Sequence, residues 1–426
     1  MKLFPPLLLS LSLALSAQDK PNDPFIKSPA AAPQPPDGPT DITMLVETIT
    51  LPQADYAAWL DEPGGREKLH ARAIEAVKGG KAALDGLHFI RAKDGNRIML
   101  ESVEDIRSPT EWDAALESGY QHPTAFETYS MGDRIEMEFT MEKNVCSHVN
   151  HTIQRQRFAG FRHVKPDSTP PHVVAPDIVR KNTPGSARAL SGVPVLLATH
   201  ALAGSVTLLF GTTRSVILDK KPAAPEKTAA NIVLTPRVIS LDRQRAWDML
   251  RRHPEDSAAC LAELKTMLAA KEAALEHLST LNTLSGQRAT HEAGSDFIFG
   301  AEFNPPAKDI SKPDATDGQA GHSAFTSIRL GYQWEAESIF NDETGCIHTT
   351  FDFSRVTHAG DMKDALWSPN YPVLPVFTRQ HVTTTITQQP GTTILVSTLN
   401  PPGDTGVNDR KDENRVWLLF LETLAP

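Results

Sequence analysis

The chain lacks the short motifs that mark the common catalytic centres. Its 426 residues contain no Gly-x-Ser-x-Gly elbow, no phosphate-binding loop, no His-Glu-x-x-His helix and no dinucleotide fingerprint. Each of these motifs places a nucleophile, a metal ligand or a backbone cradle where its reaction needs one. Without any of them, we expect no catalytic residue, no metal, no cofactor and no enzymatic activity.

Long runs of like charge and long apolar segments are also missing. The net charge of −10 is spread along the chain, which argues against a nucleic-acid partner. No stretch reaches the 20 or so apolar residues that a membrane-spanning helix needs. With 40% hydrophobic and 22% charged residues, the composition is that of a soluble globular protein long enough for two domains.

The N-terminus has the pattern of a secretory signal peptide. Lys2 precedes the apolar stretch Leu7 to Leu15, and the small residues Ser16 and Ala17 end it. We therefore predict a signal peptide over 1–17, a mature chain that starts near Gln18, and export. Residues 18–40 are rich in Pro and Ala without periodicity, which predicts an extended tether.

Cysteine is scarce, and two of the three residues recur in the same pattern. Cys146 and Cys346 each stand in Cys-x-His, while Cys260 stands apart. Two ligands per copy fall short of a zinc shell, so a strand with a small buried Cys is the favoured interpretation. A Cys146–Cys346 disulfide in an oxidising compartment stays open, because spacing alone cannot decide it.

What the chain does contain is an internal repeat. Four blocks recur in the same order at a shift of 180 to 199 residues. The pairs are ITMLVETITL with IVLTPRVISL, DGNRIMLESVED with SGQRATHEAGSD, AFETYSMGDRIEMEF with AFTSIRLGYQWEAES, and VPVLLATHALAGSVTLLFGTT with LPVFTRQHVTTTITQQPGTT. We predict two tandem domains, 41–219 and 231–426, joined by a linker at 220–230.

Each repeat is expected to begin with a short strand, 46–51 or 233–241, followed by a helical region. In the second copy Asp242 is a plausible N-cap, apolar residues keep helical spacing as far as Leu278, and Pro254 should divide the run into two helices. Pro63-Gly64-Gly65 should divide the first copy in the same way.

The rest of each repeat alternates apolar and polar residues, as strands do. Ile135, Met137 and Phe139 should share one face, and Ile347, Thr349 and Phe351 another. The stretches 165–191 and 304–323 are polar and rich in Pro, so we expect loop insertions there. The predicted fold class is α+β, dominated by β, with long antiparallel hairpins.

Four pairs of residues recur at matching places in the repeats. His200 and His381, and Glu101 and Glu292, are the closest approach to catalytic candidates, but none has a partner nearby in sequence, so structural roles are favoured. Gly95-x-Arg97 and Gly286-x-Arg288 predict a hairpin turn that needs Gly, followed by an Arg with a fixed structural partner.

These blocks resemble the secretin domain of bacterial type II and type III secretion and pilus systems. The resemblance rests on the "sGqrA" turn, a Gly leading into a "tLevtP" strand, the "r.v.T.v.v.dGqTvvlgGl" block and a closing "lifvTp" strand, at 285–289, 331–338, 378–396 and 416–423, and more weakly in 41–219. Where the family has Gly-Gly and paired turns, this chain has Ser397-Thr398-Leu399 and then Asn400 to Asp404.

The resemblance implies two alternatives for function. Secretins form rings whose combined barrel crosses the outer membrane, which would make this chain a secretin-like component of a protein secretion or pilus channel. The missing family motifs favour instead a periplasmic structural or adaptor protein with a decayed secretin fold and no pore. In both, the expected partners are envelope or secretion-system proteins, with a homo-oligomeric ring and the outer membrane in the first, and no nucleic acid in either.

Overall fold

The computed structural model describes residues 38–65, 67–113, 122–142, 146–163, 174–202, 204–220, 231–304, 321–362, 374–402, 405–407 and 414–425. The predicted signal peptide, almost all of the tether, and residues 221–230 of the linker lie outside these ranges. Within them the chain is built mainly of strands, with four helices, so the predicted α+β class dominated by β is confirmed.

The elements of the first half follow one another in the order strand, two helices, strands. They are β1 (Thr40–Pro52), α1 (Gln53–Asp61), α2 (Leu69–Lys78), β2 (Ala83–Lys93), β3 (Arg97–Asp113), β4 (His122–Glu142), β5 (Cys146–His163), β6 (Val174–Leu190), β7 (Val195–Leu202) and β8 (Ser205–Ile217).

The second half repeats this order with one additional short strand. Its elements are β9 (Asn231–Asp242), α3 (Arg243–Arg252), α4 (Ser257–Ala269), β10 (Ala273–Leu278), β11 (Leu281–Leu284), β12 (Arg288–Asn304), β13 (Gly321–Asn341), β14 (Cys346–Asp361), β15 (Pro375–Gln388), β16 (Thr392–Leu399) and β17 (Arg415–Leu424).

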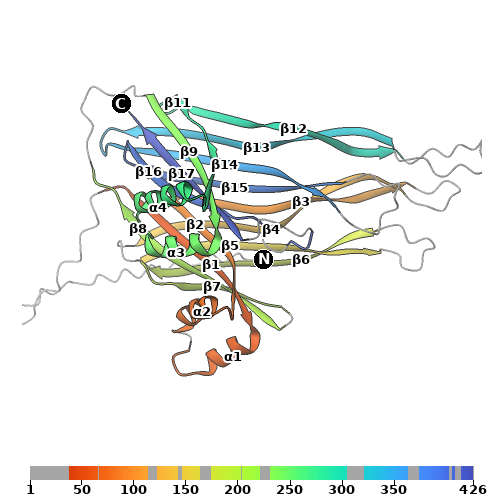
Figure 1. Ribbon diagram of the computed structural model, residues 1–426, viewed down its shortest axis with the longest axis horizontal. Helices are drawn as coiled ribbons and strands as arrows, with labels where there is room; N and C mark the ends of the chain where they lie inside the picture. The colour runs from red at the N-terminus through yellow and green to blue at the C-terminus, as the bar shows by residue number, and fades with distance from the viewer. Residues whose placement is uncertain are drawn as a thin grey trace, which may run out of the picture. The chain divides into compact units, whose positions relative to one another are not determined.

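Both halves contribute strands to the same two antiparallel sheets (Figure 1). The eight-stranded sheet has the order β12-β13-β14-β15-β3-β4-β5-β6. The nine-stranded sheet has the order β10-β9-β17-β16-β2-β1-β8-β7, with β11 also paired to β9. In each sheet, therefore, the strands of one half stand together and meet those of the other half at a single boundary.

The pairing within the two halves is the same down to its irregularities. The β1–β2 register skips Asp85 and the β9–β10 register skips Glu276, each opposite the equivalent point of the first strand. A second bulge precedes Gly160 in β5 and Gly360 in β14, and both glycines have positive φ, 117° and 111°. A common topology with common bulges is what an internal repeat predicts, and duplication itself stays our proposal.

Alternation along the strands buries apolar side chains on both faces of the nine-stranded sheet. Ile42, Met44 and Val46 pack with residues of the eight-stranded sheet, including the predicted row Ile135, Met137 and Phe139. On the other face, apolar residues of the sheet pack with helical side chains, among them Trp247 and Leu264. The nine-stranded sheet thus lies between the helices and the eight-stranded sheet.

The predicted helix boundaries are confirmed where capping or Pro sets them. The Asp242 carboxylate accepts a hydrogen bond from the Arg245 backbone N–H at 3.1 Å, as an N-cap does. Helix α3 ends before Pro254 and α4 begins after it, while Pro63-Gly64-Gly65 separates α1 from α2. The prediction of helix as far as Leu278 was wrong beyond Ala269, because residues 273–278 form strand β10 and pair with β9.

Two other sequence predictions need correction. Residues 174–190, expected to be loop, form strand β6, which lies at the edge of its sheet, where Pro176 and Pro184 are tolerated. Gly95 and Gly286 do have positive φ, 78° and 79°, but their turns are not hairpins. Each turn connects a strand of the nine-stranded sheet to a strand of the eight-stranded sheet.

Candidate functional site

The boundary between the two halves contains a network of buried polar side chains, and we call this boundary the inner joint. There β15 pairs with β3 from Phe377–Asp105 to Thr383–Met99, and β16 meets β2 at Ser397–Ile90. The joint brings strands that are far apart in sequence side by side in both sheets.

His381 lies at the centre of this joint, between two carboxylates. Its Nε2 is 2.9 Å from Oδ2 of Asp352 on β14, and its Nδ1 is 3.6 Å from Oε2 of Glu101 on β3. The hydroxyl of Thr383 donates to the same Asp352 oxygen at 2.7 Å. The histidine therefore bridges a carboxylate of its own half and one of the other half.

Burial by itself would lower the pKa of His381, but hydrogen bonds to Asp352 and Glu101 and their charges raise it to about 9. The hydrogen bond from His381 and the nearby arginines hold the pKa of Glu101 below its ordinary value. At neutral pH the site therefore holds an imidazolium ion between two carboxylates.

Two arginines of the same sheet complete the charge network. Arg379 lies 3.6 Å from Glu101 and 3.3 Å from Asp105, and Arg134 on β4 lies 3.4 Å from Glu101. Glu101 is buried and faces three cationic side chains. Pairing of this kind is what keeps a carboxylate charged at a buried position.

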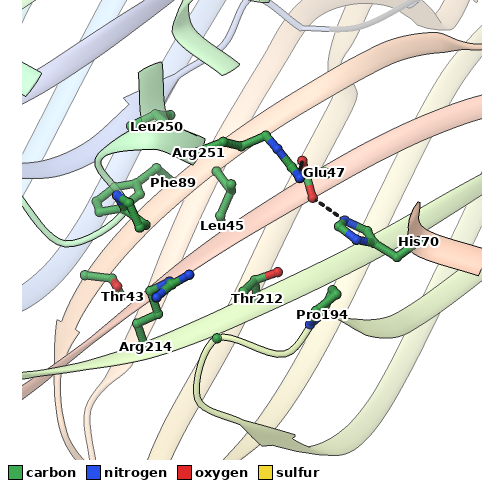
Figure 2. Close-up of a pocket in the computed structure, with 12 residues that line it drawn as sticks. Thr43, Leu45, Glu47, His70, Phe89, Pro194, Thr212, Arg214, Leu250 and Arg251 are labelled. Carbon is green, nitrogen blue, oxygen red and sulfur yellow. Dashed lines mark hydrogen bonds and ion pairs between the residues drawn. The ribbon is translucent and has the colours of Figure 1, made fainter. Parts of the chain in front are cut away.

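A second polar cluster lies on the helix-covered face of the nine-stranded sheet (Figure 2). Glu47 of β1 is buried and accepts hydrogen bonds from the indole N–H of Trp247 and from Arg251, both on α3 of the other half, the latter at 2.9 Å. His70 of α2 lies 2.8 Å from the other Glu47 oxygen. Burial favours the neutral acid, but these contacts outweigh it and lower the pKa of Glu47.

This cluster borders a cavity of about 230 Å³. The cavity is lined by Thr43, Leu45, Glu47, His70, Phe89, Gly192, Pro194, Thr212, Arg214, Leu250, Arg251 and Pro254. Its arginines are already paired with carboxylates, since Arg214 pairs with Glu255 at 3.0 Å and Arg251 with Glu47 at 2.9 Å. The cluster is therefore better suited to holding α3 on β1 than to receiving a charged ligand.

The two predicted histidines are not equivalent. His381 lies on β15 of the eight-stranded sheet, whereas His200 lies on β7 at the edge of the nine-stranded sheet, 2.8 Å from the Thr183 hydroxyl. The fourth pair of sequence blocks therefore matched β7 with β15, which belong to different sheets. The shared bulges place Asn182, on β6, at the position that corresponds to His381.

The glutamates and arginines of the other recurring pairs do occupy equivalent positions. Glu292 on β12 corresponds to Glu101, but it is exposed and contacts Arg329 and Gln333. Arg97 pairs with Glu136, and Arg288 pairs with Glu335 at 3.1 Å, one strand away in each half. The fixed partner that the recurrence indicated is thus a glutamate on the next strand.

Among the described side chains, Cys346 forms neither the metal site nor the disulfide that the sequence left open. Cys346 is buried and free, so it is not bridged to Cys146, whose side chain lies outside the described ones. Burial raises the pKa of the Cys346 thiol, as expected for a small buried side chain. Among the described residues, no group of three or more His, Cys, Asp or Glu is arranged to hold a metal ion.

Sequence reasoning missed Asp352, Arg379, Glu47 and Trp247. Their partners lie on other elements, often in the other half, and only strand register brings them together.

In the described part of the chain, no helix has the length and apolarity to cross a membrane.

No family model matches the chain, and no curated protein is similar to it in sequence. Among solved structures, it is similar to the InvG secretin domain of the Salmonella SPI-1 injectisome, with 9% identity and a TM-score of 0.25 over 52% of this chain and 70% of that one. It is also similar to a chain of the ETEC pilotin–secretin AspS–GspD complex, with 8% identity and a TM-score of 0.22 over 91% of this chain and 49% of that one.

Proposed function

We propose that the protein is an exported, secretin-like component of the bacterial cell envelope in which two tandem units act as consecutive subunits of an assembly. The inner joint carries this proposal. Two units of one topology meet strand to strand in both sheets, and the pairing leaves a free strand at each outer end among the described residues. A protein secretion or pilus channel at the outer membrane is the assembly that the sequence resemblance favours.

The polar network of the joint supports a structural role over a catalytic one. A general base must be unprotonated to accept a proton, and the pKa of His381, about 9, keeps it charged at neutral pH. The Thr383 hydroxyl donates to Asp352. Burial would raise the pKa of that carboxyl, but the hydrogen bond and charge of His381 lower it overall, so Asp352 is a weak base for activating a nucleophile. We therefore propose that the protein has no intrinsic enzymatic activity.

A second candidate function is a periplasmic structural or adaptor protein without a pore. The segment that replaces the family's Gly-Gly motif favours it. Thr398 donates to the Leu87 carbonyl at 3.0 Å and accepts from the Phe89 backbone N–H at 2.8 Å, and Asn400 donates to the Leu87 carbonyl at 2.7 Å. These buried side chains fasten the segment to the first half.

Cell fractionation, followed by native mass measurement and electron microscopy of detergent-extracted protein, tests the proposal. A large ring in the outer-membrane fraction would support the channel, and a soluble monomer or dimer in the periplasm would support the adaptor. Protein that stays in the cytoplasm with Met1 retained would contradict both. A broad hydrolase and transferase screen, with His381→Asn as the control, tests the absence of activity.

A further inference from the structure

The inner joint shows what each outer end of the chain would contact if another copy were present. In the described residues, β6 and β12 end the eight-stranded sheet, and β7 and β10 end the nine-stranded sheet. Strand β6 corresponds to β15 and β12 to β3, so these open edges are the counterparts of the two sides of the inner joint. Unpaired edges are templates for pairing with another chain.

Charges at the open edges match those of the inner joint. Arg180 on β6 is equivalent to Arg379 on β15. Ile178 and Phe377 lie beside the same bulge, and each arginine follows two residues later. On β12, Glu292 and Asp296 correspond to Glu101 and Asp105, the two carboxylates that Arg379 contacts. Arg180, Glu292 and Asp296 are all exposed.

Apolar residues that are buried at the inner joint are exposed at its open counterparts. Leu87 is opposite Glu47 and is 0% exposed, whereas Leu278 is opposite the equivalent Arg237 and is 54% exposed. Leu395 of β16 is 2% exposed, and Leu196, at the same position of β7, is 37% exposed. Exposed leucines at both edges are what an unfilled joint would leave.

The two residues of the helix contact have counterparts of opposite charge in the other half of the chain. At the inner joint Arg251 of α3 binds Glu47 of β1. Asp61 of α1 is equivalent to Arg251, because each follows the matching leucine, Leu51 or Leu241, by ten residues. The residue equivalent to Glu47 is Arg237. An outer joint would therefore pair Asp61 with Arg237.

Helix α1 also lacks the cover that α3 has. Helix α3 buries Ala246, Trp247, Met249 and Leu250, while α1 buries no residue, although Tyr56, Trp59 and Leu60 occupy three of the four equivalent positions. Strands β1 and β2 cover α3, so the equivalent cover for α1 would be strands β9 and β10.

We propose that a second copy of this chain occupies the open edge, with β6 and β7 of one copy pairing with β12 and β10 of the next in the register of the inner joint. Arg180 then faces Glu292 and Asp296, and Asp61 faces Arg237. If two first halves met, Asp61 would repel Glu47, and if two second halves met, Arg251 would repel Arg237. The reversed charges therefore favour contacts in which first and second halves alternate. The proposal rests on the proposed role as an assembly unit and names its partner.

Cysteine cross-linking of the purified full-length chain tests the register. Asn182 and Glu292 correspond to the facing pair His381 and Glu101, so Asn182→Cys with Glu292→Cys should give a ladder of cross-linked multimers on mild oxidation. In the control, Asn182→Cys with Asp296→Cys, the second thiol is four residues away, about 13 Å along the strand. The control and the parent chain should give several-fold less product. No ladder, or equal ladders from pair and control, would overturn the proposal.

Charge reversal tests the helix contact without relying on oxidation. Asp61→Arg and Arg237→Asp should each shift the native mass toward the single chain, and the double variant should restore the multimer. Circular dichroism of each variant checks that the fold survives. A double variant no better than the single ones, in folded protein, would contradict the Asp61–Arg237 contact. Both readouts use purified protein, so they can succeed or fail independently of where fractionation finds the protein in the cell.

Discussion

Nδ1 of His381 lies 3.6 Å from the carboxylate of Glu101, and this contact joins the second half of the chain to the first. The two residues face one another in the β15–β3 register. Since His381 also contacts Asp352, a single protonated side chain connects β14, β15 and β3.

The folded state should become less stable as His381 loses its proton. The pKa of His381 is raised from 6.5 to about 9, so its contribution is fully present below pH 6.5 and is lost as pH rises through about 9. At about 1.4 kcal/mol per pH unit, we expect a loss of roughly 2–3 kcal/mol. Urea unfolding at pH 6.5 and pH 9.5 measures it. In His381→Asn, which carries the residue found at position 182, the same interval should change stability far less. Equal pH dependence in both proteins would refute the assignment.

Loss of the Glu101 charge should destabilise the joint. Glu101→Gln leaves Arg134, Arg379 and His381 facing a neutral amide at a buried position, and we expect a cost of about 2 kcal/mol. Its matched control is Glu292→Gln on the exposed edge, which should change stability by less than about 0.5 kcal/mol in the single chain. Urea midpoints of the two variants compare them directly, and equal midpoints would argue against a special role for Glu101.

Acid should weaken the fold through a buried neutral histidine. His88 is 2% exposed, its Nδ1 lies 2.9 Å from Asn400, and burial lowers its pKa to about 4. Its contribution is complete above pH 6.5 and is lost as pH falls toward 4, by about 3 kcal/mol. His88→Asn retains an acceptor for Asn400 and should show a shallower loss between pH 6.5 and pH 4.5. An unchanged slope would mean that other groups govern the acid transition.

The turn glycines provide a prediction about the backbone. Gly286 has φ of 79°, and a Cβ there would meet no atom within 4 Å, so the only penalty of a side chain is backbone strain. Gly286→Val should cost about 1–3 kcal/mol, while Gly286→Asn should cost less, because Asn adopts positive φ more readily. Melting temperatures of the two variants test this, and a Val variant that melts with the parent protein would disprove the strain.

The sequence predicted features that depend on local chemistry. The N-cap at Asp242, the break at Pro254 and the positive φ at Gly95 and Gly286 each need only a few neighbouring residues. The buried row at Ile135 follows from period-two alternation. Of these features, the turn glycines occur in both halves, whereas α1 begins after Pro52 without a side-chain cap.

Predictions failed where tertiary context overrides the local pattern. Pro176 and Pro184 indicated a loop, yet an edge strand tolerates Pro because one side of its backbone has no strand partner. Leu275 fits helical spacing but pairs in β10. His381 had no partner nearby in sequence, because Asp352 and Glu101 reach it through strand register.

An electron cryomicroscopy map of the full-length protein tests the central claim most directly. We expect two halves that superpose, with bulges at Gly160 and Gly360, and β15 paired to β3 with His381 opposite Glu101. Halves of different topology, or a map in which β15 and β3 are not neighbours, would contradict it.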